Sequence, residues 1–185
     1  MNSEPLNLHR ELIDRCKQGD EQAYWNLYKL YSKAMFNTAL RITGREDEAE
    51  DVLQEAFISA FRNLTDYRGD ASFGSWLKRI VINKAINAVK KRRYELIPDD
   101  EEFDVAEEPE QQEMPGLTVD RVRAAMMTLP DGYRSVLSLY LLEGYDHQEI
   151  AGILQITEST SKSQLNRAKN KLRNLLIKEP DVYEK

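Results

Sequence analysis

The sequence of 185 residues predicts an all-α protein with two small helical domains joined by an acidic flexible linker. Apolar residues recur at helical spacing along most of the chain, and no stretch shows the strict alternation of a half-buried strand. Residues 94–120 contain 11 acidic and no basic side chains, together with several prolines, which disfavours a packed core. We therefore expect domains at residues 1–93 and 118–185, with the linker over residues 94–117.

Four helices are expected in the first domain, over residues 8–18, 20–44, 46–64 and 72–93. Gly19 stops the first helix, and Asp20 is a plausible N-cap for the second. The positions expected to face inward are Ala23, Leu27, Leu30, Tyr31, Ala34, Leu40, Ile42, Ala49, Val52, Leu53, Ala56, Phe57, Ala60, Phe61, Phe73, Trp76, Leu77, Ile80, Val81, Ala85, Ile86 and Val89.

The second domain is expected to begin with helices over residues 119–128 and 131–142. After Gly144, a short helix follows to residue 154. Asp146 can cap it, with Glu149 three positions later in a variant of the capping box.

The last helix, over residues 158–178, is capped by Thr157 and turns Leu165, Ala168, Leu172 and Leu176 inward. From residue 159 to 178 it carries six Lys or Arg and no Asp or Glu. A short helix, a tight turn and a basic second helix form the helix-turn-helix layout, in which the second helix enters the DNA major groove. An ordinary helical hairpin with a solvated basic face is the alternative.

Composition excludes several classes of protein. No apolar run approaches the roughly 20 residues that span a bilayer, and the first residues lack the layout of a signal peptide, so no membrane insertion is expected. Cys16 is the only cysteine, which excludes an intrachain disulfide and favours the cytoplasm.

His9 and His147 lie far apart without cysteine neighbours, so no metal and no cofactor are expected. No nucleophile–base pair or phosphate loop is present, so the chain is interpreted as a binding protein rather than an enzyme.

The net charge of −6 is the sum of +3 over residues 1–93, −11 over residues 94–120 and +2 over residues 121–185. The low pI therefore describes the linker more than the surfaces that would meet a partner. The linker is either a passive solubilising spacer or a polyanion that competes with nucleic acid for a basic groove.

Acidic residues gather on the third helix, whereas residues 62–93 hold nine Lys or Arg against Asp66 and Asp70. Two faces of opposite charge suggest two partners, although an acidic run can also be a solvated surface. Tyr67, Phe73 and Trp76 flank the loop over residues 68–71 of this basic segment, where they either stack on unpaired bases or belong to the core.

From about residue 20 to residue 176, the chain resembles the extracytoplasmic-function (ECF) RNA polymerase sigma factors. The resemblance is carried by EDEAEDVLQEAFISAFRNL, YRGDASFGSWLKRIVINKAINAVKKRR, LPDGYRSVLSLYLLEGYDHQEIAGIL and ITESTSKSQLNRAKNKL, in the family's order. It implies promoter-specific transcription initiation with core RNA polymerase, control by an anti-sigma factor, and a monomer in the free state.

The resemblance also implies three sets of contact residues. Core polymerase would meet Asp47, Glu50, Asp51, Gln54 and Glu55 on the third helix. The −10 element would be melted and captured by Tyr67, Arg68, Ser72, Phe73, Arg79, Asn83, Lys90, Lys91, Arg92 and Arg93. The −35 duplex would be read by Ser159, Thr160, Lys162, Ser163, Gln164, Asn166 and Arg167.

The sequence departs from the family's usual pattern at three positions. Gln155 replaces a glycine in the turn, where a left-handed residue costs about 1 kcal/mol. Ser161 replaces a buried aliphatic residue, which weakens the packing of the last helix. Gln164 replaces a basic residue, which alters base preference.

Two other functions fit part of the pattern. A stand-alone helix-turn-helix regulator would bind an operator without polymerase, usually as a dimer. An RNA- or protein-binding adaptor would tolerate loss of Asn166 and Arg167, but not of the acidic helix.

Overall fold

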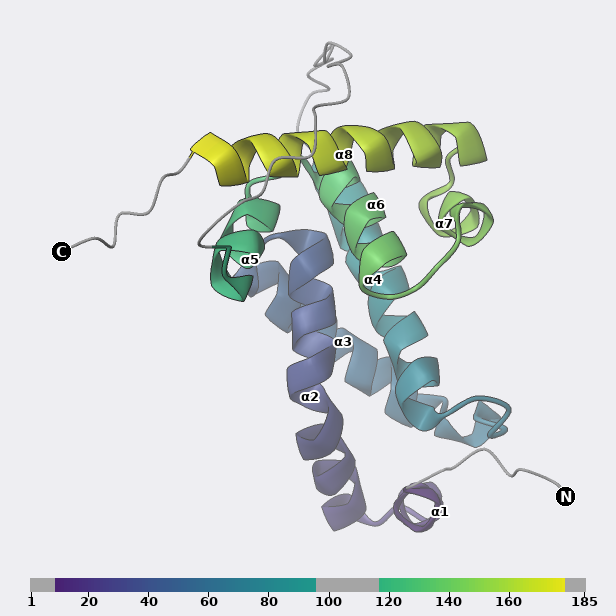
Figure 1. Cartoon of the computed structure of the whole chain (residues 1–185). Coiled ribbons are helices and arrows are strands. Elements are labelled where there is room, and N and C mark those ends of the chain that lie inside the picture. The colour runs from purple at the N-terminus through teal and green to yellow at the C-terminus, as the bar shows by residue number, and fades with distance from the viewer. Residues whose placement is uncertain (1–8, 96–116, 179–185) are drawn as a thin grey trace, which may run out of the picture. The chain divides into compact units, whose positions relative to one another are not determined.

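The computed structural model describes residues 9–95 and 117–178, and every regular element in these ranges is a helix. Two compact units, Met1–Lys91 and Arg92–Lys185, are described separately below. The predicted all-α fold with a C-terminal helix-turn-helix is confirmed, whereas nearly all of the acidic stretch lies outside the described residues. The elements are α1 (Arg10–Lys17), α2 (Glu21–Thr43), α3 (Glu46–Arg62), η1 (Leu64–Asp66), α4 (Phe73–Glu95), α5 (Val119–Met127), α6 (Asp131–Leu141), α7 (His147–Leu154) and α8 (Glu158–Lys178) (Figure 1).

Helix α2 has a well-defined cap at each end. The Asp20 carboxylate accepts hydrogen bonds from the amides of Gln22 and Ala23, at 2.9 and 3.2 Å, which satisfies donors that the first turn would leave unpaired. Gly44 ends the helix in the left-handed region at φ 74°. The predicted cap at Asp20 is therefore confirmed.

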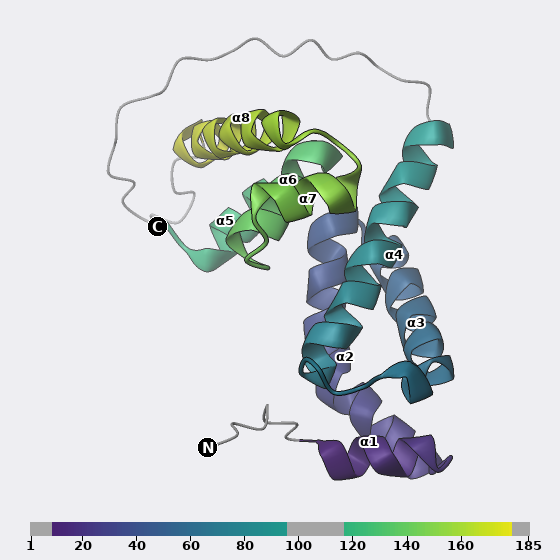
Figure 2. The ribbon, with the colours of Figure 1, turned by 90° about the vertical axis from the view of Figure 1, so that its right-hand side faces the viewer.

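Helices α2, α3 and α4 form the core of the first unit (Figure 2). Aromatic rings from α2 and α3 alternate along their contact, with Tyr24 against Phe61 and Tyr28 against Phe57, each at 4.8 Å between ring centroids. Gly74 allows α4 to approach α2 closely, because a Cβ there would lie 2.9 Å from the Tyr31 ring. The aromatic pairs and this close approach hold α2, α3 and α4 together.

The predicted buried face of α2 is wrong at two positions. Leu30 is 52% exposed and Ala34 is exposed, whereas Met35 and Ala39 are buried. Leu30 precedes Tyr31 by one residue, which turns it about 100° away from the stripe that faces the core. In α4, Ile82 is buried in addition to the predicted residues.

The second unit is organised around α8, which packs against α5, α6 and α7. Its predicted inner residues Leu165 and Ala168 are buried, and Leu172 and Leu176 are half-buried. Arg134 on α6 is also buried.

The Arg134 guanidinium donates hydrogen bonds to the Leu129 carbonyl at 2.8 Å and to the Asp131 carboxylate at 2.6 Å. This charged group is therefore paired where water is excluded, as a buried cation requires.

Candidate nucleic-acid interface

Helix α7 begins at the capping box that the sequence predicts. The Glu149 amide donates to the Asp146 carboxylate at 2.8 Å, and the Asp146 amide donates to the Glu149 carboxylate at 2.9 Å. The helix ends at Gln155, which adopts the left-handed region with φ 59° and ψ 47°. Among the described residues other than glycine, Gln155 alone has a positive φ, so the turn carries the strain expected from the missing glycine.

The cap of α8 uses the predicted Thr157. Its hydroxyl accepts a hydrogen bond from the Thr160 amide at 3.0 Å and lies 2.7 Å from the Thr160 hydroxyl. The cap thus fixes the first turn of the helix that would enter the groove.

The predicted −35 residues divide into an exposed group and a partly covered pair. The exposed residues are Ser159, Lys162, Ser163, Asn166 and Arg167. Thr160 is half-buried in the cap. Gln164 is half-buried, and its side chain lies against Gly132 on α6. A Cβ added to Gly132 would be 3.6 Å from the Gln164 side-chain oxygen. The exposed residues are small polar or basic, the types that approach and read base edges.

A second candidate surface lies on the first unit and begins at the loop before α4. Arg68, Asp70 and Ser72 are exposed there, and Ser72 begins α4 by accepting a hydrogen bond from the Ser75 amide at 3.2 Å. Gly69 takes a left-handed conformation at φ 85°, which turns the chain back towards α4.

The aromatic residues of this loop belong to the core of the first unit. Tyr67 is 6% and Phe73 2% exposed, and their rings meet edge to face at 5.6 Å. The Tyr67 hydroxyl donates to the Ala71 carbonyl at 2.6 Å, and Lys17 on α1 donates to the Tyr67 carbonyl at 3.0 Å. In this conformation neither ring presents a face for stacking, whereas Trp76 is half-buried.

Polar and basic side chains continue along one stripe of α4. Arg79, Asn83 and Lys91 are exposed, and Lys90 and Arg92 are half-buried. The sequence prediction missed Asn87, which is exposed and lies four residues after Asn83, on the same face. The i, i+4 spacing from Arg79 to Lys91 is the signal that would have included it. The side chain of Arg93 lies outside the described part of the chain.

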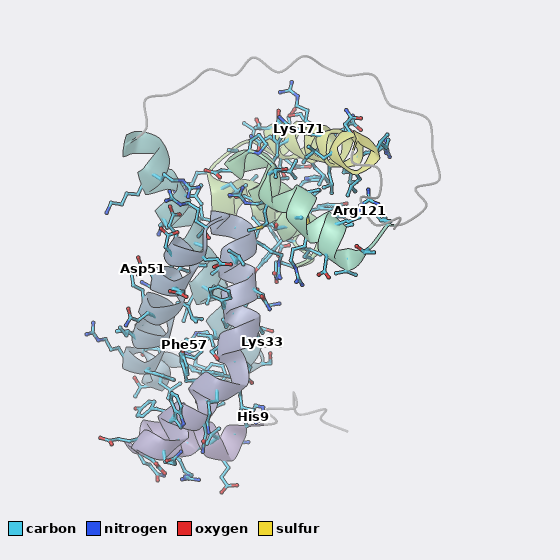
Figure 3. All side chains as sticks on the ribbon, turned by 90° about the vertical axis from the view of Figure 1, so that its left-hand side faces the viewer. His9, Lys33, Asp51, Phe57, Arg121 and Lys171 are labelled. Atoms are coloured by element: carbon cyan, nitrogen blue, oxygen red, sulfur yellow. The ribbon has the colours of Figure 1, made fainter. Side chains whose placement is uncertain are left out.

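The acidic face of α3 borders an apolar groove. The groove has a volume of about 820 Å³ and is lined by Tyr28, Phe36, Glu50, Asp51, Leu53, Gln54, Phe57, Ile58 and Phe61. Asp51 projects away from the helices while Phe57 turns towards α2 (Figure 3). Ile58 at the groove is 45% exposed. Carboxylates beside exposed apolar side chains fit a partner that is both basic and apolar.

Two predicted members of the acidic set do not line this groove. Glu55 is paired with Lys84 on α4, with 3.3 Å between carboxylate oxygen and ammonium nitrogen. Asp47 lies 3.6 Å from the Arg45 guanidinium in the first turn of α3. The structure therefore brings together Glu50, Asp51 and Gln54, but not the whole predicted set.

Within residues 9–95 and 117–178, no helix has the length and apolar character to cross a membrane. The same ranges contain no group of His, Cys, Asp or Glu side chains arranged to hold a metal ion.

A helix-turn-helix unit combined with a second helical unit that bears its own basic surface defines a class of multi-region DNA-binding proteins. Residues 27–94 match Sigma-70 region 2, and residues 120–172 match Sigma-70, region 4. The chain is 32% identical over 173 residues to the RNA polymerase sigma-H factor of Pseudomonas aeruginosa, covering 86% of this chain and 89% of that protein.

A second relative agrees with this class, and a solved structure shares the fold. The chain is 32% identical to the ECF RNA polymerase sigma factor SigM of Mycobacterium tuberculosis over 168 residues, covering 90% of this chain and 83% of that protein. The fold resembles the sigma factor RpoE in complex with the anti-sigma factor NepR from Bartonella quintana. That likeness has a TM-score of 0.55 at 22% identity and covers 85% of this chain and 98% of the other.

The chain belongs to the ECF group of RNA polymerase sigma factors. Its class of function is therefore transcription initiation through promoter DNA, and the stand-alone regulator is not supported.

Proposed function

We propose that the chain binds core RNA polymerase through the α3 groove, reads the −35 element as duplex with α8, and melts the −10 element with α4 and its preceding loop. The observation that carries this proposal is the presence, on one chain, of a helix-turn-helix, a separate basic stripe and an acidic apolar groove. A regulator that acts alone has no need of the second and third surfaces. The protein would act by binding, as a cytoplasmic monomer, with no catalytic step of its own.

The −35 part of the proposal rests on the exposed residues of α8. Asn166 and Arg167 are long enough to reach base edges, and Ser159 and Ser163 let the backbone approach the groove. Lys162 forms an ion pair with Glu158 at 2.7 Å, so its ammonium is shared between that carboxylate and any phosphate.

The −10 part rests on Arg68, Ser72, Arg79, Asn83 and Lys91, which are exposed along the loop and α4. Basic groups would hold the strand backbone, while polar side chains would contact unpaired bases. For Tyr67 and Phe73 to touch a base, their buried rings would have to move, so we assign them to the support of the loop.

The polymerase part rests on the groove beside Glu50 and Asp51. Since the solved relative is a complex with an anti-sigma factor, we also propose an anti-sigma partner for this chain. Such a partner would silence the protein by covering surfaces that polymerase or DNA needs.

The proposal is tested by co-elution of the purified chain with bacterial core RNA polymerase on size-exclusion chromatography. We expect stable co-elution of the wild type and its loss in the variant Glu50→Lys/Asp51→Lys. The matched control is Glu11→Lys/Asp14→Lys, which makes the same charge change on exposed positions of α1. Co-elution that survives Glu50→Lys/Asp51→Lys would refute the groove as the docking site, and no co-elution of the wild type would refute the polymerase partner.

The melting role has its own test. Asn83→Ala in the reconstituted polymerase should slow promoter opening, followed by permanganate reactivity of unpaired thymines, more than it weakens closed-complex binding. Equal loss in both assays would count against a role in melting.

A further inference from the structure

Ser161 is a polar residue in the core of the second unit. It is 0% exposed and lies in the first turn of α8, between the predicted contact residues Thr160 and Lys162. A buried hydroxyl is costly unless it has a hydrogen-bond partner. Its oxygen lies 2.9 Å from Nδ1 of His147, the first residue of α7.

His147 is held in turn by a second contact. Its ring stacks on Tyr140 at the end of α6, with 4.7 Å between centroids and 23° between planes. The Lys169 ammonium on α8 lies 5.8 Å from the centroid of the same Tyr140 ring. The half-buried imidazole therefore joins α6, α7 and α8 at the point where the recognition helix begins.

This position controls which side chains α8 presents. Successive residues of a helix are turned by about 100°, so fixing Ser161 inward places Ser159 and Ser163 on nearly the opposite side. Both are exposed. A hydrogen bond has a preferred length and direction, whereas an aliphatic contact at the same place would allow the helix to roll.

We propose that the His147–Ser161 pair sets the orientation of α8 and is thereby a specificity-determining device that touches no base itself. His147 and Ser161 are positioning residues. The inference rests on the proposed reading of the −35 duplex by α8, and it gives a role to the polar residue at a position where an aliphatic side chain is expected.

The test uses the full chain reconstituted with core RNA polymerase and a pool of duplex DNA with a randomised central segment. Sequencing of the bound fraction gives the preference, and calorimetry of the free chain gives stability. Four variants are compared: Ser161→Ala, His147→Phe, His147→Asn, and the double variant His147→Phe/Ser161→Val. Asn174→Ala, at an exposed position on α8, is the matched control.

We expect Ser161→Ala and His147→Phe to reduce the preference for the best sequence over a scrambled one by about five- to tenfold, the scale of one net hydrogen bond. Binding to the scrambled duplex should keep its salt dependence, because the phosphate contacts remain. His147→Asn places an amide nitrogen where Nδ1 stood and should retain the preference. The double variant replaces the polar pair by apolar groups, and should regain stability without regaining the wild-type preference.

Three results would overturn the inference. One is a double variant that recovers both stability and wild-type preference, since the pair would then serve folding alone. The second is an unchanged preference in Ser161→Ala and His147→Phe, and the third is a loss of preference in His147→Asn equal to that in His147→Phe. If the wild type itself enriches no sequence, the proposed reading of the −35 duplex fails, and this inference fails with it.

Discussion

The amide of Ile156 donates a hydrogen bond to the carbonyl of Ala151 at 3.1 Å, closing the turn of the helix-turn-helix around Gln155. The bond forms only because Gln155 takes the left-handed conformation, at φ 59°. For a residue with a Cβ that conformation costs about 1 kcal/mol, and glycine avoids the cost.

Gln155→Gly is therefore expected to raise the free energy of unfolding of the second unit by about 0.5–1 kcal/mol. Both tryptophans, Trp25 and Trp76, belong to the first unit, so tryptophan fluorescence reports the unfolding of that unit only. Unfolding of the second unit is followed by calorimetry, as the transition that has no counterpart in the fluorescence. The matched control is Gln148→Gly, the same exchange at an exposed position in the first turn of α7, which should destabilise that transition by up to about 1 kcal/mol. A loss of stability in Gln155→Gly would contradict the strain at this turn.

A second prediction concerns acid stability of the first unit. A hydrogen bond from Arg15, and then one from the Ala23 amide, hold the pKa of Asp20 below its ordinary value. Because the pKa is depressed in the folded state, the stabilisation is complete above the unfolded value of about 3.9 and is lost as the pH falls through the folded value. Asp20→Asn keeps the cap but removes the charge. The wild type should therefore have the higher free energy of unfolding at neutral pH, and the free energies of the two proteins should become equal in acid.

This convergence is measured by urea unfolding, monitored by tryptophan fluorescence, over a series of pH values. A difference between the two proteins that stays constant with pH would show that the charge of Asp20 has no part in it.

A third prediction concerns the thiol of Cys16, which is 0% exposed. Burial, aided by the nearby Asp20 carboxylate, raises its pKa to about 11. At pH 8 the thiolate is then on the order of one part in a thousand, so an aromatic disulfide reagent should react only when the first unit opens. The reaction rate should rise with urea in step with the loss of tryptophan fluorescence. Rapid reaction of the native protein would contradict this burial.

A fourth prediction concerns Arg167, exposed on α8. Arg167→Ala is expected to weaken promoter use by about 1–3 kcal/mol if its guanidinium contacts a guanine in bidentate fashion, and to relax selectivity at one −35 position only. Transcription from a set of single-position −35 variants measures this. A uniform loss at every variant would instead assign Arg167 to a phosphate contact.

Local features of the sequence predicted the framework well. The caps at Asp20, Asp146 and Thr157 depend on residues two or three positions away, and all three are confirmed. The left-handed turn at Gln155 was expected from the resemblance to the family, which usually has glycine there. The contact sets of the interfaces stay predictions.

Features that depend on distant residues were not accessible in this way. Tyr67 is held by Lys17 from another helix, so its burial could not be read from the loop. Glu55 was grouped with its acidic neighbours, although Lys84 on α4 pairs with it at the surface between the two helices. The groove beside Asp51 also exists only once α2 and α3 have packed, because aromatic rings from both helices line it.

Helix α8 is both the proposed reader of DNA and the element against which α5, α6 and α7 pack. Few structural changes can therefore alter promoter choice, since moving α8 as a whole would disturb its packing against the other three helices. Substitutions at exposed positions such as Ser163 and Asn166 leave the packing of the unit intact, while Leu165 and Ala168 are constrained by packing. Divergence between copies of such a protein, or redesign of one, is thereby confined to a few outward-facing side chains and to the His147–Ser161 pair beneath them.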